Sequence, residues 1–448
     1  MDRVSPSRGG VESSERLSVD ELRDTWSLLE PEDRWVAFRM AAYEDAEEFF
    51  LSLNALDQAD LLRAMPAVER RGWMRLLPPD DAADVVQASD AELRDGLLAL
   101  LDEATRKEVV ALLAYEEDEA GGLMDPRFAR VRPDMSVDEA ISYLRKQARE
   151  YVGTLRYLYV LDDQQRLLGV VALRSIFSAS PETRVRDVMR TDVVTATEDM
   201  DQEALSRLFS QHGINAIPVV DPAGRMKGIV TVDDIVEVVQ EEATEDIQKL
   251  GGMEALDAPY MAVGFLAMVR KRGTWLSALF LGEMLTATAM GYFQDEIARA
   301  VVLALFVPLI ISSGGNSGSQ ATTLVIRAMA LGEVTLRDWW RVVRRELAAG
   351  LALGAMLGVI GMLRIVVWQA FSPIYGPHFM LIAWTVGLSL VGVVTFGTLA
   401  GSLLPFLLRR LRLDPASASA PFVATLVDVT GLVIYFTVAS TILRGHLL

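Results

Sequence analysis

The stretch APFVATLVDVTGLVIYFTVA (residues 420–439) consists of apolar or small side chains with one carboxylate, Asp428, near its middle. About 20 such residues in a helix span the hydrocarbon core of a bilayer. A charged side chain at that depth costs at least about 2.5 kcal/mol, so acids inside membrane spans generally mark the path of an ion or a proton. The stretch therefore predicts a membrane protein with a functional acid. The alternative is a neutral, hydrogen-bonded carboxylic acid inside a helix bundle.

Charge divides the 448-residue chain into two parts. Residues 1–272 contain 53 acidic and 32 basic residues, a net charge of −21, whereas the remainder contains 8 acidic and 11 basic residues. The acidic part favours cations as partners and argues against nucleic acid and anionic lipid surfaces. The chain has no cysteine and three scattered histidines, which excludes disulfides and argues against a soft-metal site. The first 20 residues lack the apolar core of a signal peptide, and we expect them to be disordered.

Five apolar stretches predict five membrane-spanning helices in a transmembrane domain at 273–448. They are residues 274–293, 297–315, 347–368, 380–408 and about 421–443. Basic residues gather before the first stretch, between the second and third, and between the fourth and fifth, whereas the alternate loops 294–296 and 369–378 have none. Because cytoplasmic loops are rich in Lys and Arg, this pattern places the N-terminal part in the cytoplasm and the C-terminus outside. A purely cytosolic sensor or scaffold is thereby excluded.

The acidic part contains two kinds of repeat. Residues 67–114 divide into four units of twelve residues, each with charges at its front and an apolar cluster at its back, which predicts a stack of short helices. Such an all-α bundle, placed at 21–122, is a regulatory domain or a spacer. A second repeat aligns YVLDDQQRLLGVVALRSIF (159–177) with PVVDPAGRMKGIVTVDDIV (218–236). Each copy reads helix, strand, turn, strand, helix, and the pair resembles tandem α+β CBS domains, at 123–183 and 184–241.

CBS pairs often bind adenine nucleotides such as ATP, through a hydroxyl and an acid after the second strand. The second copy offers Thr231 and Asp234 for this contact, whereas the first has Ser175 in place of the acid. Residues 242–272 then predict a connecting helix rich in acids. Like charges four residues apart destabilise such a helix until a counter-ion arrives, and a solvated helix face is the alternative interpretation.

The segment VPLIISSGGNSGSQATTLVIRAMA (307–330) predicts a broken membrane helix. Pro308 frees a backbone carbonyl, and the glycines permit non-helical turns, which in membranes are confined to buried or water-lined sites. Broken helices of this kind place backbone groups on ion paths. The alternative is a patch of small residues for helix packing. The residues predicted to line a pore are Gly314, Gly315, Asn316, Gly318 and Gln320, together with Thr425 on the last span.

Six motifs occur in order along the chain: YEEDEAGGLM (115–124), GIVTVDD (228–234), EATEDIQKLG (242–251), GGNSGSQ (314–320), LPFLLRRLRLDPA (404–416) and the stretch around Asp428. In these motifs and their order the chain resembles the MgtE-type magnesium channels over nearly its whole length. The resemblance implies a homodimer in the bacterial plasma membrane, with a plug helix between CBS pair and membrane, a pore at the dimer interface and Mg²⁺ at Asp428. It also implies that cytosolic acids bind regulatory Mg²⁺ and close the pore. Those acids are Asp80, Asp84, Asp201, Glu203, Asp234, Glu237, Glu242, Glu245, Asp246 and Asp414.

The predicted function is a Mg²⁺ channel that cytosolic Mg²⁺ closes. Mg²⁺ keeps its waters and prefers oxygen ligands, which suits carboxylates with largely outer-sphere contacts. A proton-coupled transporter with Asp428 as a proton relay is the alternative, and a CBS-gated anion channel is disfavoured by that acid. Mn²⁺, Co²⁺ or Ni²⁺ as the main substrate stays open, although oxygen-only ligands favour hard ions. No nucleophile–base pair or phosphate-cradling motif is present, so we expect no enzyme.

Overall fold

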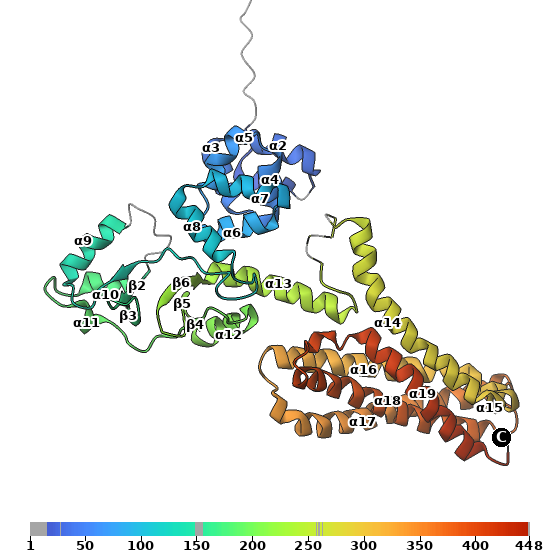
Figure 1. Cartoon of the computed structure of the whole chain (residues 1–448). Helices are drawn as coiled ribbons and strands as arrows, with labels where there is room; N and C mark the ends of the chain where they lie inside the picture. The colour runs from blue at the N-terminus through green and yellow to red at the C-terminus, as the bar shows by residue number, and fades with distance from the viewer. Residues whose placement is uncertain are drawn as a thin grey trace, which may run out of the picture. The chain divides into compact units, whose positions relative to one another are not determined.

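A computed structural model describes residues 16–26, 28–147, 156–256, 258, 260–261 and 263–446 (Figure 1). The chain forms two compact units that divide between Gln240 and Glu241. The first contains the helical domain and the CBS pair, and the second contains the long apolar helices. Most of the N-terminal segment 1–20, for which disorder is predicted, lies outside the described residues, although its last two residues begin the first helix.

The helical domain consists of eight short helices that begin at intervals of twelve residues. They are α1 Val19–Trp26, α2 Pro31–Arg39, α3 Tyr43–Leu51, α4 Ala55–Ala64, α5 Ala67–Met74, α6 Pro79–Ala88, α7 Ala91–Leu100 and α8 Glu103–Leu112. The four predicted units each begin a helix at their first residue, which confirms the stack of short helices. The same period extends over four further units towards the N-terminus, which the sequence interpretation missed.

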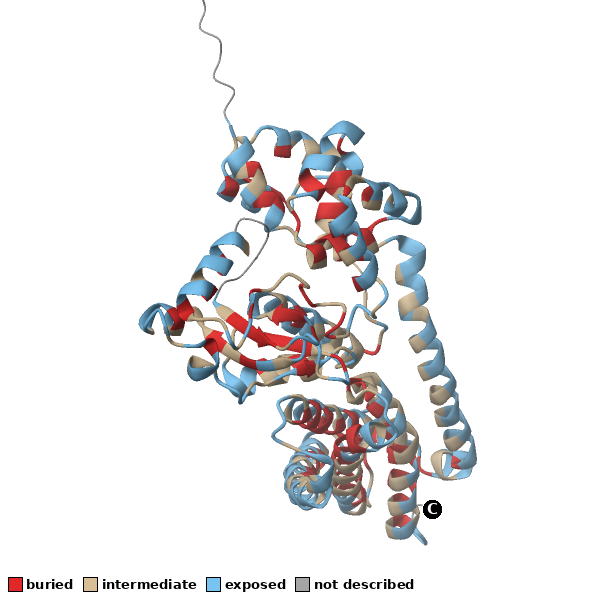
Figure 2. Ribbon diagram, turned by 60° about the vertical axis from the view of Figure 1, so that its left-hand side comes forward, coloured by how far each residue is buried: buried red, intermediate tan, exposed pale blue. Residues whose placement is uncertain are grey.

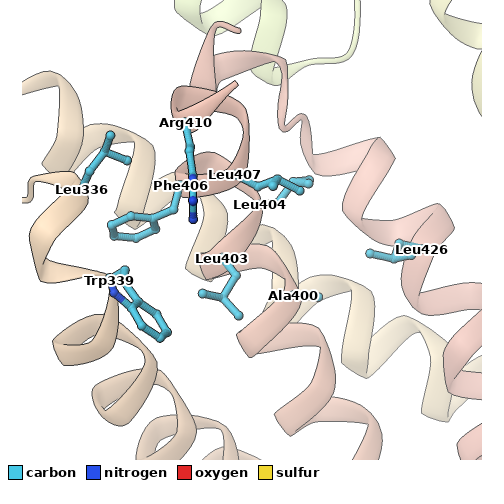
Figure 3. Close-up of a pocket in the computed structure, with 9 residues that line it drawn as sticks. All are labelled: Leu336, Trp339, Ala400, Leu403, Leu404, Phe406, Leu407, Arg410 and Leu426. Atoms are coloured by element: carbon cyan, nitrogen blue, oxygen red, sulfur yellow. The ribbon is translucent and has the colours of Figure 1, made fainter. Parts of the chain in front are cut away.

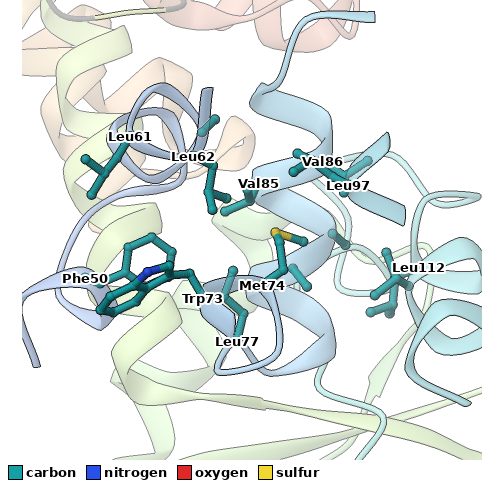
Figure 4. Packing of buried hydrophobic residues seen from close by; sticks show 14 of the residues in the cluster. Phe50, Leu61, Leu62, Trp73, Met74, Leu77, Val85, Val86, Leu97 and Leu112 are labelled. Carbon is teal, nitrogen blue, oxygen red and sulfur yellow. The ribbon is translucent and has the colours of Figure 1, made fainter. Parts of the chain in front are cut away.

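Aromatic and leucine side chains at the backs of the units form the core of this domain. Phe50, Trp73 and Met74 lie together at its centre, with Leu61 and Leu62 beside them (Figure 4). The rings of Phe50 and Trp73 are 5.3 Å apart. Burying a large aliphatic or aromatic side chain contributes about 1.5–3 kcal/mol, so this shared core holds helices together that are too short to be stable alone.

Two similar three-stranded sheets confirm the tandem CBS repeat. The first contains β1 Arg130–Val131, β2 Tyr157–Leu161 and β3 Leu167–Ala172, and the second contains β4 Ala196–Thr197, β5 Ala216–Val220 and β6 Met226–Thr231. In each sheet the first strand pairs parallel with the second and the second antiparallel with the third. The accompanying helices are α9 Val137–Gln147, α10 Leu173–Ser178, α11 Val185–Val188 and α12 Gln202–His212.

The segment after the second sheet differs from the predicted connecting helix. Helix α13 spans Val232–Leu250 and so begins inside the second CBS repeat. Gly252 follows the end of α13 with a φ of +74°, a backbone conformation that residues other than glycine rarely adopt. The next helix, α14, spans Phe265–Tyr292. The segment 242–272 is therefore not one helix, because Gly251 and Gly252 follow the end of α13 and α14 begins only at Phe265.

Four helices of the second unit are long and apolar enough to cross a membrane, as far as the described residues go. They are α16 Val307–Ala330 with the preceding 3₁₀ turn Val301–Phe306, α17 Trp339–Phe371 with the turn Leu336–Asp338, α18 Phe379–Arg410 and α19 Ala420–Leu443. Four of the five predicted spans thus coincide with helices that have the length and hydropathy for crossing. Helix α14 is continuous and long enough, but Glu283 and its polar neighbours lower its hydropathy, so its crossing stays a prediction. A short helix, α15 Gln294–Arg299, follows it.

The predicted break in the second span is wrong, because α16 is one unbroken helix through SSGGNSGSQ. Its irregular backbone is the 3₁₀ turn before Val307, and Pro308 lies in the first helical turn, where it is tolerated. The glycines serve the alternative role of close packing. A Cβ atom on Gly397 would lie 2.3 Å from the carbonyl oxygen of Gly314, and one on Gly401 would lie 2.2 Å from that of Gly318. In Figure 2, buried residues lie inside the bundle of long helices.

Candidate metal sites

Five aspartates of the first unit form one cluster, which we call the α6 acid cluster: Asp80, Asp81, Asp84, Asp125 and Asp234. The first three lie on α6, whose apolar residues Ala82, Ala83, Val85 and Val86 are buried and so hold the helix in place. Asp125 is fixed by backbone pairing with β6, since its N–H donates to the Ile229 carbonyl at 2.8 Å and its own carbonyl accepts at 2.9 Å. Asp234 accepts from the Thr231 N–H at 3.0 Å and from the Thr231 hydroxyl at 2.9 Å.

Burial and mutual repulsion raise the pKa of every carboxyl group in this cluster. Burial raises the pKa of Asp84 to about 8, and the charges of Asp81 and Asp234 add to the effect. The pKa of Asp80 is raised well above its usual value by burial and then by Asp125. Burial likewise raises the pKa values of Asp81, Asp125 and Asp234 to about 6. The carboxylates are thus crowded enough that protons or a cation must relieve their repulsion.

The cluster suits a hydrated divalent cation better than a directly coordinated one. The Oδ1 atom of Asp80 is buried without a hydrogen-bond partner in the structure. In the described part of the chain, no three His, Asp or Glu side chains are placed to hold a metal ion directly. Mg²⁺ retains several of its waters when it binds to one or two carboxylates, and those waters can reach an acceptor such as this Oδ1 atom.

The predicted regulatory acids separate into three groups. Asp80, Asp84 and Asp234 lie in the α6 acid cluster, and Glu237 interacts with its members Asp81 and Asp84. Asp201 and Glu203 lie elsewhere and have structural partners. The Asp201 carboxylate caps α12 by accepting from the Glu203 and Ala204 N–H groups at 3.0 and 3.2 Å. The Glu203 carboxylate forms an ion pair with Arg207 at 2.6 Å.

The third group lies in the second unit and already contains a cation. Lys249, on α13, donates to the Asp414 carboxylate at 2.6 Å and forms an ion pair with Glu245. Burial lowers the pKa of Lys249, but its hydrogen bonds to Asp414 and Glu245 outweigh this and raise the pKa to about 12. We call these three residues the Lys249 ion-pair group. Glu242 and Asp246, also predicted to bind Mg²⁺, are half-buried on the same helix.

A second acid stands beside Asp428 in the membrane unit. Helix α14 packs against α19, and the Glu283 and Asp428 carboxyl groups lie close enough to interact. Thr425 lies three residues before Asp428 on α19. Helix α14 comes close to it, since a Cβ atom on Gly282 would lie 3.0 Å from the methyl group of Thr425. The basic residue of α17 at this level of the sequence, Arg364, has other partners: it donates to the Tyr375 hydroxyl at 3.0 Å and stacks on Trp368.

The predicted pore-lining residues of α16 lie on two different faces. Gly314, Gly315 and Gly318 are buried against α18 and α19, and their place along a pore stays a prediction. Asn316 and Gln320 are exposed and share a face, four residues apart. Exposed amide side chains on a membrane helix are costly against lipid, so we expect this face to meet water or another protein surface.

Sequence reasoning missed Asp81, Asp125 and Lys249 as members of these groups. Asp81 adjoins Asp80, so the paired acids at the start of α6 were a usable signal. Glu245 and Lys249 are four residues apart, so their ion pair was also a usable signal. Asp125, and the contact of Lys249 with Asp414, had none, because distant segments meet there. The candidate nucleotide residues Thr231 and Asp234 are hydrogen-bonded to each other, and Asp234 also belongs to the α6 acid cluster.

Three family models match the chain. One described as a divalent cation transporter, MgtE, matches residues 307–438. The MgtE intracellular N domain matches residues 17–118, and the CBS domain matches residues 120–182 and 185–241.

Relatives match nearly the whole chain. The magnesium transporter MgtE of Thermus thermophilus is 41% identical over 434 residues, which are 96% of this chain and 94% of that protein. The magnesium transporter MgtE of Bacillus subtilis is 32% identical over 96% of this chain and 87% of that protein. An inosine-5'-monophosphate dehydrogenase of Methanocaldococcus jannaschii is 32% identical over only 24% of this chain and 21% of that enzyme.

One solved structure is the cytosolic domain of the Mg²⁺ channel MgtE in complex with ATP, 40% identical to this chain. It covers 51% of this chain and 92% of its own length, with a TM-score of 0.47.

Proposed function

The chain belongs to the MgtE family of divalent cation transporters, and from this premise we propose that it is a Mg²⁺ channel closed by cytosolic Mg²⁺. It is a membrane protein with a CBS pair, and its whole-chain relatives are magnesium transporters rather than enzymes. The observation that carries the proposal is Asp428 with Glu283 beside it in the membrane unit. Two carboxyl groups in a low-dielectric bundle attract a cation and repel anions.

We place the conduction path between two copies of the chain. The exposed amides of α16 require a polar or protein surface beside them, which a second copy supplies. In the soluble part, Val236 and Val239 on α13 are 55% and 50% exposed, an apolar stripe that dimerisation would cover. Partners are thus a second copy and the surrounding lipid, in a bacterial plasma membrane with soluble domains inside and the C-terminus outside.

Gating follows from the α6 acid cluster. At low cytosolic Mg²⁺ its carboxylates repel one another, and bound Mg²⁺ neutralises them and stabilises a compact closed arrangement. Moving a two-state equilibrium from mostly open to mostly closed requires about 5.5 kcal/mol of differential binding. Several weak sites, each contributing about 1 kcal/mol at millimolar Mg²⁺, supply this by linkage.

The test is the divalent-cation current in membrane patches while cytosolic Mg²⁺ is raised from near zero to about 10 mM. We expect a large current at low Mg²⁺ that closes as Mg²⁺ rises. Asp428→Ala should abolish the current, because the path loses its charge. Asp295→Asn, which removes an exposed acid after α14, is the control and should conduct normally. A normal current in Asp428→Ala would refute the assignment of the path.

The second candidate is a proton-coupled transporter of divalent cations. The contact between Asp428 and Glu283 favours it, because two adjacent carboxyl groups can share and pass a proton. In reconstituted vesicles, Mg²⁺ uptake that follows an imposed pH gradient and stops in Glu283→Gln would support this function. Uptake that ignores the gradient would support the channel.

An adenine nucleotide such as ATP is a proposed second ligand of the CBS pair. Since Asp234 would serve both the nucleotide and the α6 acid cluster, the two ligands should influence each other. Calorimetric titration with ATP in the absence and presence of Mg²⁺ tests this. Thr231→Val should weaken nucleotide binding, and equal heats for both proteins would dismiss the site.

A further inference from the structure

An apolar pocket of about 710 Å³ opens in the second unit between the start of α17 and the end of α18 (Figure 3). Trp339 and Leu336 line it from the α17 side, and Leu403, Phe406 and Leu407 line it from α18. One charged residue, Arg410, shares this lining. The pocket is thus an open apolar pocket whose lining includes one basic side chain.

The pocket lies at the level where the membrane meets the cytoplasm. Helix α18 ends at Arg410, and Arg409 and Arg412 adjoin it in the loop that the distribution of basic residues places inside the cell. Trp339 and Trp340 begin α17, and tryptophan is enriched at this depth because its ring is amphipathic. At this depth we expect acyl chains beside the apolar part of the pocket and lipid phosphate groups beside its charged end.

The Arg410 side chain is placed to meet a phosphate. In Figure 3 it extends beside Phe406 and ends over the apolar lining. Nearby Arg341 has Asp338 as its partner at 2.7 Å, whereas in the described part of the chain no acid pairs with Arg410. A guanidinium group binds phosphate oxygens through two parallel hydrogen bonds. Basic pockets between membrane helices on the cytoplasmic side suit anionic headgroups for this reason.

We propose that this pocket binds an anionic phospholipid, with an acyl chain against Trp339, Leu403 and Leu407 and the phosphate on Arg410. A second copy of the chain is a poorer occupant, because an apolar helix seated there would bury the Arg410 charge without a partner. The strongly acidic soluble part repels anionic membrane surfaces, so a dedicated basic pocket gives this lipid class a specific place on the protein.

Native mass spectrometry of the full chain in detergent tests the proposal. Dioleoyl-phosphatidylglycerol and dioleoyl-phosphatidylcholine are added at equal concentration, and the retained lipid is counted. We expect the wild type to prefer phosphatidylglycerol and Arg410→Gln to bind it about tenfold more weakly, the effect of losing a charged hydrogen bond. Arg409→Gln removes the same charge one residue away, outside the lining, and should retain lipid as the wild type does.

Two further arms decide between occupants. Ala400→Phe places a ring in the pocket and should lower retention of phosphatidylglycerol, whereas Ala352→Phe on the exposed side of α17 should not. Inorganic phosphate at about 10 mM should displace little lipid, because it lacks an acyl chain. Unchanged lipid preference in Arg410→Gln would overturn the proposal. So would an Ala400→Phe protein that keeps its lipid but changes its oligomeric mass. Neither result depends on Mg²⁺ transport, so this proposal and the proposed function fail separately.

Discussion

The α6 acid cluster and the Lys249 ion-pair group both gather carboxylates, but they relieve the resulting repulsion in different ways. In the Lys249 ion-pair group a lysine of the chain stands between Glu245 and Asp414, and its charge persists at neutral pH. In the α6 acid cluster, burial and repulsion raise the pKa of each aspartate. A group of carboxylates that is already neutralised by a lysine should bind Mg²⁺ weakly. We therefore expect the α6 acid cluster to sense Mg²⁺, and we expect Glu245 and Asp414 to maintain the structure of the second unit.

The largest effect should come from removing charge in the α6 acid cluster. We expect the double variant Asp80→Asn, Asp84→Asn to raise the free energy of unfolding of the Mg²⁺-free protein by about 2 kcal/mol, because two crowded acids become neutral. The stabilisation that we expect about 10 mM Mg²⁺ to give the wild type should be absent from the variant, since the ion has lost its ligands. Thermal unfolding of the full chain, followed by tryptophan fluorescence, measures both effects.

Asp24→Asn is the control for this variant, because Asp24 is an exposed acid on α1, outside the cluster. Its unfolding temperature and its response to Mg²⁺ should match the wild type. A double variant that is less stable without Mg²⁺, and that still responds to the ion, would show that the aspartates are satisfied in the fold. The contrast between the two groups would then be wrong.

The pH dependence of stability should distinguish the same two groups. The aspartates of the α6 acid cluster have folded-state pKa values above the unfolded value of 3.8, with Asp84 at about 8. The folded state therefore holds more protons, and stability should decrease as pH rises from about 4 to about 8. The effect of Mg²⁺ should grow over the same interval, because protons and Mg²⁺ compete for the carboxylates. Unfolding temperatures measured across this interval, with and without Mg²⁺, test both trends.

Lys249 should contribute no slope there, because its pKa is about 12 and a raised lysine pKa affects stability only at higher pH. In Asp84→Asn the decrease with pH should be smaller than in the wild type. A steeper decrease in that variant would mean that other groups dominate the titration.

The third effect concerns Lys249 itself. Lys249→Met leaves Glu245 and Asp414 facing each other without a cation, and their side chains are both 37% exposed. For carboxylates this exposed, we expect a loss of about 1 kcal/mol in the free energy of unfolding. The variant should also gain a stabilising response to Mg²⁺, because the ion can replace the missing charge. Lys249→Arg keeps the charge and should behave as the wild type. A Lys249→Met protein that gains no response to Mg²⁺ would deny that a cation is what this group needs.

The parts of the fold that local sequence patterns determine could be predicted from the sequence. The twelve-residue units, the paired CBS sheets and four apolar helices all follow from periods and lengths that neighbouring residues show. The break predicted in α16 failed because glycine and serine serve both irregular turns and close helix packing. Close packing is the role here because Gly397 and Gly401, about eighty residues further along the chain, bring their backbones against Gly314 and Gly318. The convergence of Asp125 on α6 and of Asp414 on Lys249 was likewise hidden, because distant segments meet there.

The smallest effect concerns Glu203, which tests whether an acid that is paired with a basic side chain is insensitive to Mg²⁺. This acid was predicted to bind Mg²⁺, but it pairs with Arg207 one helical turn away on α12, and its side chain is 45% exposed. A pair of this kind contributes about 0.5 kcal/mol or less. Glu203→Gln should therefore leave the Mg²⁺ response of stability and current unchanged, as for any acid with a cation partner. If the response weakens in Glu203→Gln as we expect it to in the double variant Asp80→Asn, Asp84→Asn, then Mg²⁺ displaces Arg207. A nearby lysine or arginine would then fail to distinguish structural acids from acids that sense Mg²⁺.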